Sequence, residues 1–527
     1  MKEEANRRRT FAIISHPDAG KTTLSEKFLL YGGALNLAGT VTARKRQRTT
    51  ASDWMELEKK RGISVSSTVL RFEYGGFKIN LLDTPGHRDF SEDTYRVLMA
   101  TDAALMVIDA GKGIEAQTKN LFRICARRGI PIFTFINKLD LPALEPLELI
   151  DQLEDVLDLQ AFPVTWPLDS GRYFKGIYDR LNDKVHLFKK NPGGQLKSNV
   201  SKYNFDEQKI KDLLGAKLHK KTSEEIQLID AVSGSFNRDL VREGIVSPVF
   251  FGSALNNFGV ELMLKNFLKY STPPLPRSSQ NGPVNINSSE FSAFVFKVQT
   301  NMNPRHRDRM VFIRICSGKF NRKMKIRHQR LDKEIRLSSS HNVFGRDRET
   351  LDVAYPGDIV GFVSRDDFKV GDTLTTSKDL VYNEIPRFAP EHFAFIQNPS
   401  PAKYKSFRKG IKHFLAEDLV QAFTVSEYPG PLPLLGAVGP LQFEVLQYRL
   451  KEEYGADSDL KIMPWKALRW FQTSLGEEEL KRSLPYGAAI GKDSLNRKVM
   501  LFMESWSPDH YAKEYPEVEL FESPKEK

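Results

Sequence analysis

Short apolar segments recur through the first half of the chain, and each one ends in a polar or glycine-containing loop. These segments are residues 11–14, 77–82, 103–108, 131–136 and 248–251. Stretches of helical length, such as residues 22–30 and 117–128, lie between them. Buried strands that alternate with helices are typical of an α/β domain with a mainly parallel sheet. The pattern therefore predicts that the loops after the strands gather at the sheet edge where such domains bind ligands.

The pattern changes further along the chain. Residues from about 166 to 245 are polar and contain an Asn-Pro-Gly-Gly turn, which indicates an insertion before the last strand. After a Pro- and Ser-rich linker, β-like segments separated by Gly and Asp turns predict a β-barrel. The remainder mixes helical and β patterns. We expect an α/β domain over residues 1–277, a β-barrel over 286–386 and an α+β domain over 387–527.

The composition is that of a globular chain without a membrane helix or a cysteine framework. Its 527 residues carry a formal net charge of +11, and the mean hydropathy is −0.41. No apolar run approaches the ~20 residues of a membrane helix, and the N-terminus lacks the apolar core of a signal peptide. Cys125 and Cys316 are far apart, which excludes a disulfide framework and a Cys-based zinc site. We expect a cytoplasmic protein whose charge permits an acidic partner.

The first strand leads into a loop with the residues of a phosphate-binding turn. The loop and the helix start read Ser15, His16, Pro17, Asp18, Ala19, Gly20, Lys21, Thr22, Thr23. They match the pattern G-x-x-x-x-G-K-[ST], except that Ser15 replaces the first Gly. Backbone N–H groups would hold phosphate oxygens, Lys21 would lie between the β- and γ-phosphates, and the Thr22 hydroxyl would ligate Mg²⁺. A structural turn that merely requires Gly is the alternative, and the strand–loop–helix order argues against it.

A second motif follows the apolar segment 77–82. It reads Asp83, Thr84, Pro85, Gly86, His87. An Asp at a strand end can hold Mg²⁺ through water, and Gly86 can offer its N–H to the γ-phosphate because it has no Cβ. A D-x-x-G sequence alone is usually a turn, so this prediction depends on its place after the phosphate loop.

The third motif follows segment 131–136 and would select the base. It reads Asn137, Lys138, Leu139, Asp140. The Asp140 carboxylate can accept two hydrogen bonds from N1–H and the exocyclic amine of guanine, whereas adenine lacks that pair. Buried polar groups of this kind discriminate by ~10⁴-fold or more. Lys138 can lie over the ring, and Asn137 can hold the loop. A solvated turn is the alternative for this motif alone.

Small residues close the last strand of the predicted sheet. Gly252 is followed by Ser253, Ala254, Leu255, where a backbone N–H can reach the guanine carbonyl oxygen. The signal is weak by itself. All four motifs, however, follow predicted strands, which places them at the edge where α/β sheets bind ligands. Together they predict a GTP/GDP site.

In this order the motifs resemble those of the translation-factor GTPase superfamily. His87 stands where Ras-type proteins carry a water-orienting Gln. Arg61-Gly62-Ile63-Ser64 resembles the switch I segment, with Ser64 in place of the more common Thr. The resemblance implies that Ser64 joins Thr22 and Asp83 around Mg²⁺. It also implies that Ile63 shields the reacting water and that Asp18 helps to coordinate a monovalent cation.

Further segments resemble the family of bacterial peptide chain release factors 3. They are residues 15–23, 61–64, 83–95, 165–167, 294–309, 355–359 and 436–445. The resemblance implies a ribosome-dependent GTPase of translation termination, which promotes dissociation of class-I release factors from the 70S ribosome. It implies GTP/GDP and Mg²⁺ as cofactors and a monomer without membrane or DNA partners. Lys21 and Mg²⁺ would stabilise the charge that develops on the γ-phosphate, while His87 orients the water.

Basic residues concentrate in the predicted barrel. Residues 301–350 contain 14 Lys or Arg residues against 5 Asp or Glu residues. The prominent ones are Arg305, Arg307, Arg309, Arg322, Lys323 and Lys325. We predict contact with ribosomal RNA, with a solvated barrel face as the alternative. A second cluster around residues 403–412 is predicted to be a solvated helix face, and Arg7-Arg8-Arg9 an exposed N-terminal flank.

Three other functions are compatible with parts of this pattern. Another translational GTPase, acting in translocation or recycling, would need further tRNA-mimicking domains, and only roughly 140 residues follow the barrel. A regulatory switch that acts away from the ribosome predicts no acceleration by ribosomes. A P-loop ATPase is disfavoured by Asn137 through Asp140.

Overall fold

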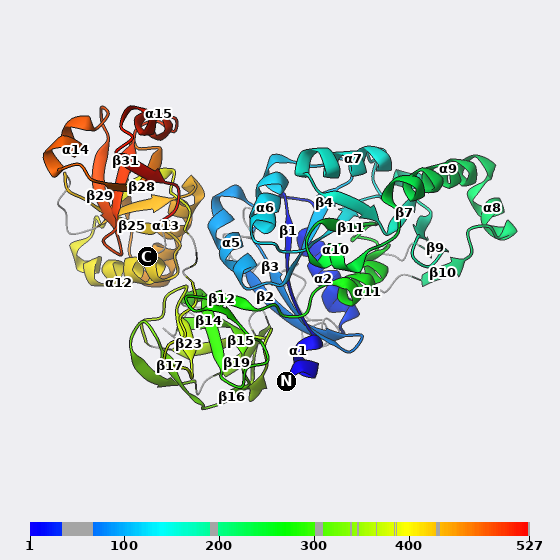
Figure 1. Cartoon of the computed structure of the whole chain (residues 1–527), viewed down its shortest axis with the longest axis horizontal. Coiled ribbons are helices and arrows are strands. Elements are labelled where there is room, and N and C mark those ends of the chain that lie inside the picture. The colour runs from blue at the N-terminus through cyan, green and yellow to red at the C-terminus, as the bar shows by residue number, and fades with distance from the viewer. Residues whose placement is uncertain are drawn as a thin grey trace.

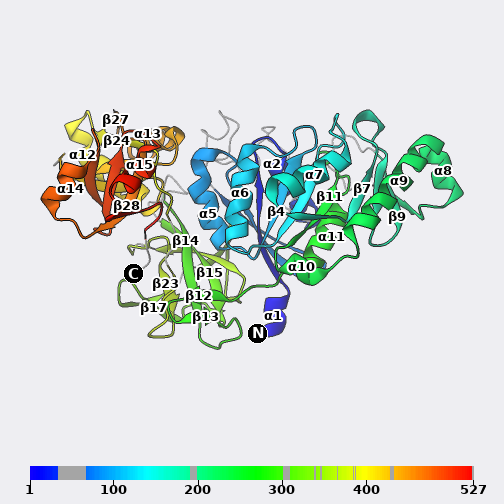
Figure 2. The ribbon, with the colours of Figure 1, turned by 45° about the horizontal axis from the view of Figure 1, so that its top comes forward.

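The computed structural model describes residues 1–33, 67–189, 199–300, 309–337, 340–344, 347–364, 366–383, 385, 387–427 and 433–524. Three large sheets organise this chain into an α/β region, a barrel region and a C-terminal region (Figure 1). The barrel region lies beside both of the others, and the C-terminal region and the far tip of the α/β region lie at opposite ends of the molecule in Figures 1 and 2.

The α/β region is built on a seven-stranded sheet in the order β2-β3-β1-β4-β5-β11-β6. Its strands are β1 (Arg8–Ser15), β2 (Thr68–Tyr74), β3 (Phe77–Asp83), β4 (Ala103–Asp109), β5 (Ile132–Asn137), β6 (Gln160–Pro163) and β11 (Val246–Phe251). Only β2 runs antiparallel to its neighbour. The predicted parallel α/β sheet is therefore confirmed, and the four predicted motifs all follow its strands.

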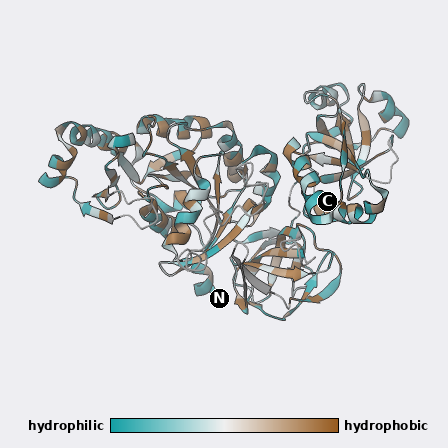
Figure 3. Ribbon diagram, turned by 180° about the vertical axis from the view of Figure 1, so that it is seen from behind, coloured by the Kyte–Doolittle hydropathy of each residue, from teal (hydrophilic) through white to brown (hydrophobic). Residues whose placement is uncertain are grey.

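Helices cover both faces of this sheet. They are α2 (Lys21–Tyr31), α5 (Ser91–Met99), α6 (Ala116–Arg127), α7 (Pro146–Leu157) and α11 (Val260–Tyr270). Alternate residues of β1 face opposite ways, so Phe11 packs with α2 and α11 while Ala12 packs with α5, α6 and α7. Figure 3 shows the hydrophobic residues concentrated in the strands and the hydrophilic ones on the outer helices.

The polar stretch before β11 forms a small sheet of its own. It contains β7 (Thr165–Leu168), β8 (Gly176–Asp179), β9 (Lys184–Lys189) and β10 (Asn199–Tyr203), followed by α8 (Gln208–Leu214), α9 (Ala216–Ser233) and α10 (Arg238–Arg242). Trp166 is fully buried, and its indole N–H donates to Glu225 of α9 at 2.8 Å. This contact fixes α9 on the small sheet, at the tip of the molecule (Figure 1).

The barrel region is an eight-stranded antiparallel sheet around one apolar core. Its order is β18-β17-β23-β14-β15-β22-β19-β20, from β14 (Ser292–Thr300), β15 (Arg309–Ser317), β17 (Lys325–His328), β18 (Lys333–Arg336), β19 (Ser340–Phe344), β20 (Asp347–Thr350), β22 (Ile359–Ser364) and β23 (Thr373–Thr375). Two short strands, β16 (Phe320–Asn321) and β21 (Val353–Ala354), pair beside it. The predicted linker before β14 contains the hairpin of β12 (Arg277–Ser279) and β13 (Gly282–Val284).

The C-terminal region has an eight-stranded antiparallel sheet. The strands are β24 (His392–Gln397), β25 (Gln421–Val425), β26 (Leu434–Ala437), β27 (Asp459–Met463), β28 (Ala467–Thr473), β29 (Ala489–Asp493), β30 (Lys498–Phe502) and β31 (Val518–Phe521). The helices are α12 (Tyr404–Ala416), α13 (Pro440–Tyr454), α14 (Glu477–Ser483) and α15 (Ser507–Glu514). This arrangement confirms the predicted α+β character.

The prediction of an exposed basic N-terminus is wrong. Helix α1 (Lys2–Asn6) leads straight into β1, and the side chains of Arg8 and Arg9 are buried. Arg8 Nε donates to Asp358 Oδ2 of the barrel region at 2.7 Å, and Arg9 Nε donates to the carbonyl oxygen of Leu268. The buried partners offset the cost of removing these charges from water, so the basic run joins two regions.

Candidate nucleotide site

The loop between β1 and α2 depends on a left-handed glycine. Gly20 has φ of 94°, and a Cβ built there would lie 2.4 Å from Asn137 Nδ2. Asp18 also has a positive φ, of 65°, and both Asp18 and Pro17 are exposed. The loop thus turns sharply at the carboxyl end of β1 and leaves its outer residues accessible.

Lys21 joins the first two motifs. Because β1 and β3 are parallel neighbours in which Ile13 lies opposite Asp83, both motifs emerge at the same edge. Lys21 Nζ donates to Asp83 Oδ1 at 2.7 Å and to the carbonyl oxygen of Thr84. Lys21 and Asp83 are buried, so this ion pair is only weakly screened by water.

His16 lies beneath the loop. Its Nε2 is 3.0 Å from Glu115 Oε2, and its Nδ1 is 3.4 Å from the Thr118 hydroxyl. Burial lowers the pKa of His16, which favours the neutral ring. These contacts join the loop to Glu115 and to Thr118 of α6.

Asn137 is the point where three loops meet. Its Nδ2 donates to the carbonyl oxygen of Ala19 at 2.8 Å, and its Oδ1 accepts the N–H of Ala254 at 2.8 Å. One buried amide therefore holds the first loop and the loop after β11 in fixed register. Since the partners are 118 and 117 residues away, only the fold brings them together.

The residues after Asn137 take up different environments. Lys138 has φ of 70°, and its Nζ lies 2.8 Å from Asp109 Oδ2. Burial alone would raise the pKa of Asp109, but hydrogen bonds from Lys138 and the Gly111 N–H lower it. Leu139 is buried, whereas Asp140 is partly exposed and its carboxylate has no hydrogen bond or ion pair within the described residues.

The loop after β11 is pinned by its own backbone. The N–H of Ser253 donates to the carbonyl oxygen of Phe258, and the Phe258 N–H donates back, each at 2.9 Å. Ser253 and Ala254 are buried, but the Leu255 side chain is 61% exposed. The small residues thus present backbone close to Asn137, while Leu255 points to solvent.

His87 stands at the rim of this edge. Its side chain is 34% exposed, and its Nδ1 accepts the N–H of Asp89 at 3.3 Å. Three residues before His87, the Thr84 hydroxyl donates to the carbonyl oxygen of Ile13 on β1. A Cβ on Gly86 would come no closer than 3.7 Å to Pro17, so this arrangement of the chain does not itself require glycine there.

Comparison of the sequence with known proteins shows which family the chain belongs to. Residues 6–273 match the family described as Elongation factor Tu GTP binding domain, residues 290–377 match Elongation factor G domain 2, and residues 382–511 match Class II release factor RF3, C-terminal domain. Peptide chain release factor 3 of Gloeobacter violaceus is 49% identical over 99% of this chain and 98% of its own length. The protein of the same name from Trichormus variabilis is 48% identical over 97% of this chain and 95% of its own.

The chain belongs to the peptide chain release factor 3 family. As a member of that family it is a GTPase of translation termination that binds guanine nucleotide. Its partners are therefore the ribosome and release factors. A crystal structure from Thermus thermophilus, titled for ttk003000868, matches with a TM-score of 0.69 and 20% identity over 94% of this chain and 72% of that one, which concerns the fold alone.

The structure adds a contact that the sequence did not predict for this release factor 3 member. Asp89 Oδ2 accepts the N–H of Leu441 at 2.8 Å, at the start of α13. A Cβ on Gly439 would lie 2.0 Å from the Asp89 Cγ, so only glycine permits this approach. Phe90 packs on Val445 beside it. We call Asp89, Gly439 and Leu441 the interdomain clasp. Asp89 lies within a segment that the family resemblance covered, but nothing in the sequence indicated that it binds Leu441.

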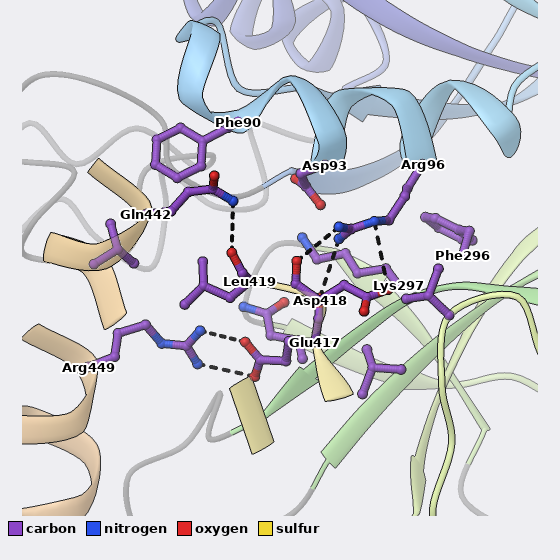
Figure 4. A pocket seen from close by; sticks show the side chains of 14 residues that line it. Phe90, Asp93, Arg96, Phe296, Lys297, Glu417, Asp418, Leu419, Gln442 and Arg449 are labelled. Atoms are coloured by element: carbon purple, nitrogen blue, oxygen red, sulfur yellow. Dashed lines mark hydrogen bonds and ion pairs between the residues drawn. The ribbon is translucent and has the colours of Figure 1, made fainter. Parts of the chain in front are cut away.

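Behind the clasp, all three regions meet around a cavity of about 70 Å³ (Figure 4). Arg449 of α13 pairs with Glu417 at 2.5 Å, and Arg96 of α5 donates to the carbonyl oxygen of Asp418 at 2.9 Å. Lys297 of β14 donates to the Ser67 hydroxyl at 2.9 Å. Figure 4 shows these charged groups converging from α5, α13 and the barrel strands. Such a polar junction fixes the orientation of the regions without a large apolar interface.

Ion pairs neutralise much of the predicted basic barrel face. Most of the acidic partners lie after residue 350, outside the range in which the charges were counted. Arg322 pairs with Asp352 at 3.4 Å, and Lys333 pairs with Asp366 at 2.8 Å. Further pairs are Arg309–Asp367, Lys325–Glu334 and Arg330–Asp372. The excess of positive charge in the sequence therefore overstates the accessible charge. Of the other residues predicted there, Arg305 and Arg307 lie outside the described residues, as do Arg61 to Ser64.

The second basic cluster is exposed, as predicted, and it borders a cleft. Lys405, Arg408, Lys409 and Lys412 of α12 line a cleft of about 850 Å³ that also includes Lys369 of the barrel region.

Within the described ranges, no group of three or more His, Cys, Asp or Glu residues is arranged to hold a metal. None of the helices described there is long and apolar enough to cross a membrane.

Proposed function

We propose that the four motifs form one GTP/GDP site and that GTP is hydrolysed there under ribosomal stimulation. The observation that carries the proposal is the double hydrogen bond of Asn137, which joins the first loop to the loop after β11. Phosphates would lie on backbone N–H groups of the loop from Ser15 to Thr23, where all residues except Pro17 carry one. The guanine would lie between Lys138 and the loop of Ser253, Ala254 and Leu255.

Asp140 would select guanine. Its carboxylate has no partner within the described residues, so it is available for the two N–H donors of the base. Adenine would leave the carboxylate unpaired in the complex, which costs affinity. The Ala254 N–H already donates to Asn137, so Asn137 rather than the base fixes the backbone of this loop.

The donors around Asp83 fit Mg²⁺. Asp83 Oδ2 is buried and has no hydrogen-bond partner in the described part of the chain, and Thr22 lies at the start of α2. Thr22 would ligate the ion, Asp83 would act through water, and Ser64, outside the described residues, would complete the set. Bound Mg²⁺ neutralises negative charge on the phosphates. Lys21, which now pairs with Asp83, would share its charge with the β- and γ-phosphates.

His87 would orient the water that attacks the γ-phosphate in line. Its Nδ1 lies 3.3 Å from both the backbone nitrogen and Oδ1 of Asp89, so Asp89 holds this edge of the ring and Nε2 is the atom assigned to the water. Breaking the bond from the γ-phosphorus to the bridging oxygen yields GDP and phosphate. Ile63 would exclude other water, and Asp18 would help to hold a monovalent cation.

On the ribosome, the GTP state would drive dissociation of class-I release factors after peptide release, and hydrolysis would let the factor leave. We also propose a cytoplasmic monomer and contact between barrel residues such as Lys323 and ribosomal RNA. The domain limits 1–277, 286–386 and 387–527 remain our proposal, which the three separate sheets support.

One experiment tests this function. Multiple-turnover hydrolysis of GTP and ATP is measured with and without 70S ribosomes, and dissociation of a class-I release factor is the second readout. We expect GTP-specific turnover that ribosomes accelerate by on the order of 10³–10⁵-fold. Equal use of ATP would contradict the base assignment, and a rate indifferent to ribosomes would contradict the mechanism.

A further inference from the structure

A second cavity lies at the opposite edge of the main sheet. It has a volume of about 410 Å³ and is enclosed by the segment before β4, the segment before β5, the linker before β12 and strand β15. The motif of Asn137 follows the carboxyl end of β5, and β4 runs parallel beside β5, so this cavity lies at the opposite end of these strands. Its size is in the range of small-ligand pockets, roughly 300–1,000 Å³.

Three arginines and one carboxylate line this cavity: Arg128, Arg277, Arg314 and Asp102. The carboxylate is already used. Arg314 donates to Asp102 Oδ2 at 2.5 Å, and the Leu275 N–H donates to Asp102 Oδ1 at 3.1 Å. Arg314 and Asp102 are both buried and form a closed pair, so the described lining offers no further acid to the other two arginines.

Arg277 lacks a carboxylate partner among the described residues. Its guanidinium lies 3.6 Å from the ring centroid of Phe294 and donates to the carbonyl oxygen of Met99 at 2.6 Å. Burial, with smaller contributions from the charges of Arg128 and Arg314, lowers the pKa of Arg277 to about 10. The guanidinium is thus held in an environment that disfavours its charge. A nearby anion would reverse that.

The carboxyl termini of two helices offset only part of this positive charge. Helix α5 ends at Met99 and α6 ends at Arg127, so two carboxyl termini are close to the cavity. Each terminus is equivalent to about half a negative charge, and the effect falls off within a turn. Together they offset about one of the two unpaired positive charges, Arg128 and Arg277. A surplus remains in a partly enclosed space.

We propose that this cavity binds a small anion of the phosphate class with at least two negative charges, either free or as the polyphosphate of a nucleotide. Guanidinium groups match phosphate oxygens in geometry as well as charge. The enclosed volume favours a small molecule over an RNA strand, which needs an extended groove. Because the lining comes from the α/β region, the linker and the barrel region, a bound anion would also stabilise their present arrangement.

The test is a calorimetric titration of the full chain, saturated with GDP, with pyrophosphate. We expect one saturable site whose affinity falls with added salt. Arg128→Gln and Arg277→Met should each weaken binding at least tenfold. Arg123→Gln, on the exposed face of α6, is the matched control and should bind like the parent. Inorganic phosphate and ATP form parallel arms, and they distinguish a free anion from a nucleotide.

Several outcomes would overturn the proposal. They are no saturable heat up to about 10 mM pyrophosphate, or unchanged affinity in both arginine variants, which would place the pyrophosphate elsewhere on the chain. Binding of an RNA oligonucleotide that both arginine variants weaken and that pyrophosphate fails to displace would also contradict a small-anion site. Arg128 is exposed, so its substitution keeps the test valid even if Arg277→Met does not fold.

Discussion

The loop of Asn137 and the segment of His87 border the same sheet edge, but they are held in different ways. Both hydrogen bonds of Asn137 go to the α/β region, at Ala19 and Ala254. The His87 segment is held by Asp89, whose carboxylate accepts the N–H of Leu441 from the C-terminal region. Base and phosphate binding can therefore be completed inside one region. The placement of His87, which we assign to the attacking water, also depends on how the regions are arranged.

The largest expected effect tests the loop of Asn137. Asp140→Asn should lose its acceptor pair for guanine, because an amide presents one donor and one acceptor. We expect GTP affinity to fall and the preference for xanthosine over guanosine triphosphate to rise by on the order of 10⁴-fold. Competition binding measures both. Asp155→Asn, exposed on α7, is the control, and an unchanged preference would remove Asp140 from base recognition.

On the other side of the comparison, His87→Ala should lose ribosome-stimulated turnover by about 10³-fold and retain GDP affinity. The reason is that His87 is assigned to the water rather than to the nucleotide. Single-turnover hydrolysis with and without ribosomes is the measurement. His392→Ala, on an exposed strand position, should behave like the parent. Full stimulation of the His87 variant would show that the water is oriented by another group.

Asn137→Ala should weaken GTP and GDP alike. It removes two buried hydrogen bonds of about 1 kcal/mol each, which corresponds to roughly 30-fold if both act on the bound state. Equilibrium binding and thermal unfolding measure the effect. Asn182→Ala removes one side-chain bond to Asp179 in the insertion and should leave nucleotide affinity unchanged. Selective loss of GTP alone would contradict a purely positioning role.

The smallest effect is expected at the interdomain clasp. In Gly439→Ala the new methyl would overlap Asp89, which should cost about 1–3 kcal/mol and displace the segment behind His87. We expect a severalfold change in stimulated turnover with GDP affinity unchanged. Gly476→Ala, where the nearest atom to an added Cβ is 3.8 Å away, is the control. A change in GDP affinity as large as the change in turnover would show that nucleotide binding also depends on how the regions are arranged.

Much of the nucleotide site was predictable because its motifs are local. The strand before each loop and the helix that follows the first loop are encoded by a few consecutive residues. The predicted parallel sheet then brings the loops to one edge. The mutual contacts were less predictable. That Asn137 binds both Ala19 and Ala254 needs the strand order, and the roles of Arg61 to Ser64 fall outside the described residues.

The sequence by itself determined the α/β architecture, the guanine-nucleotide motifs and the succession of three regions, because strand periodicity, turns and motifs each depend on a short span of residues. The tertiary structure alone decided which charges are free. The local sequence predicts that Arg8 is exposed, but in the structure Asp358, 350 residues away, accepts its hydrogen bond. Asp89 likewise meets Leu441 across 352 residues. Such partners depend on the packing of whole regions, which no local pattern encodes.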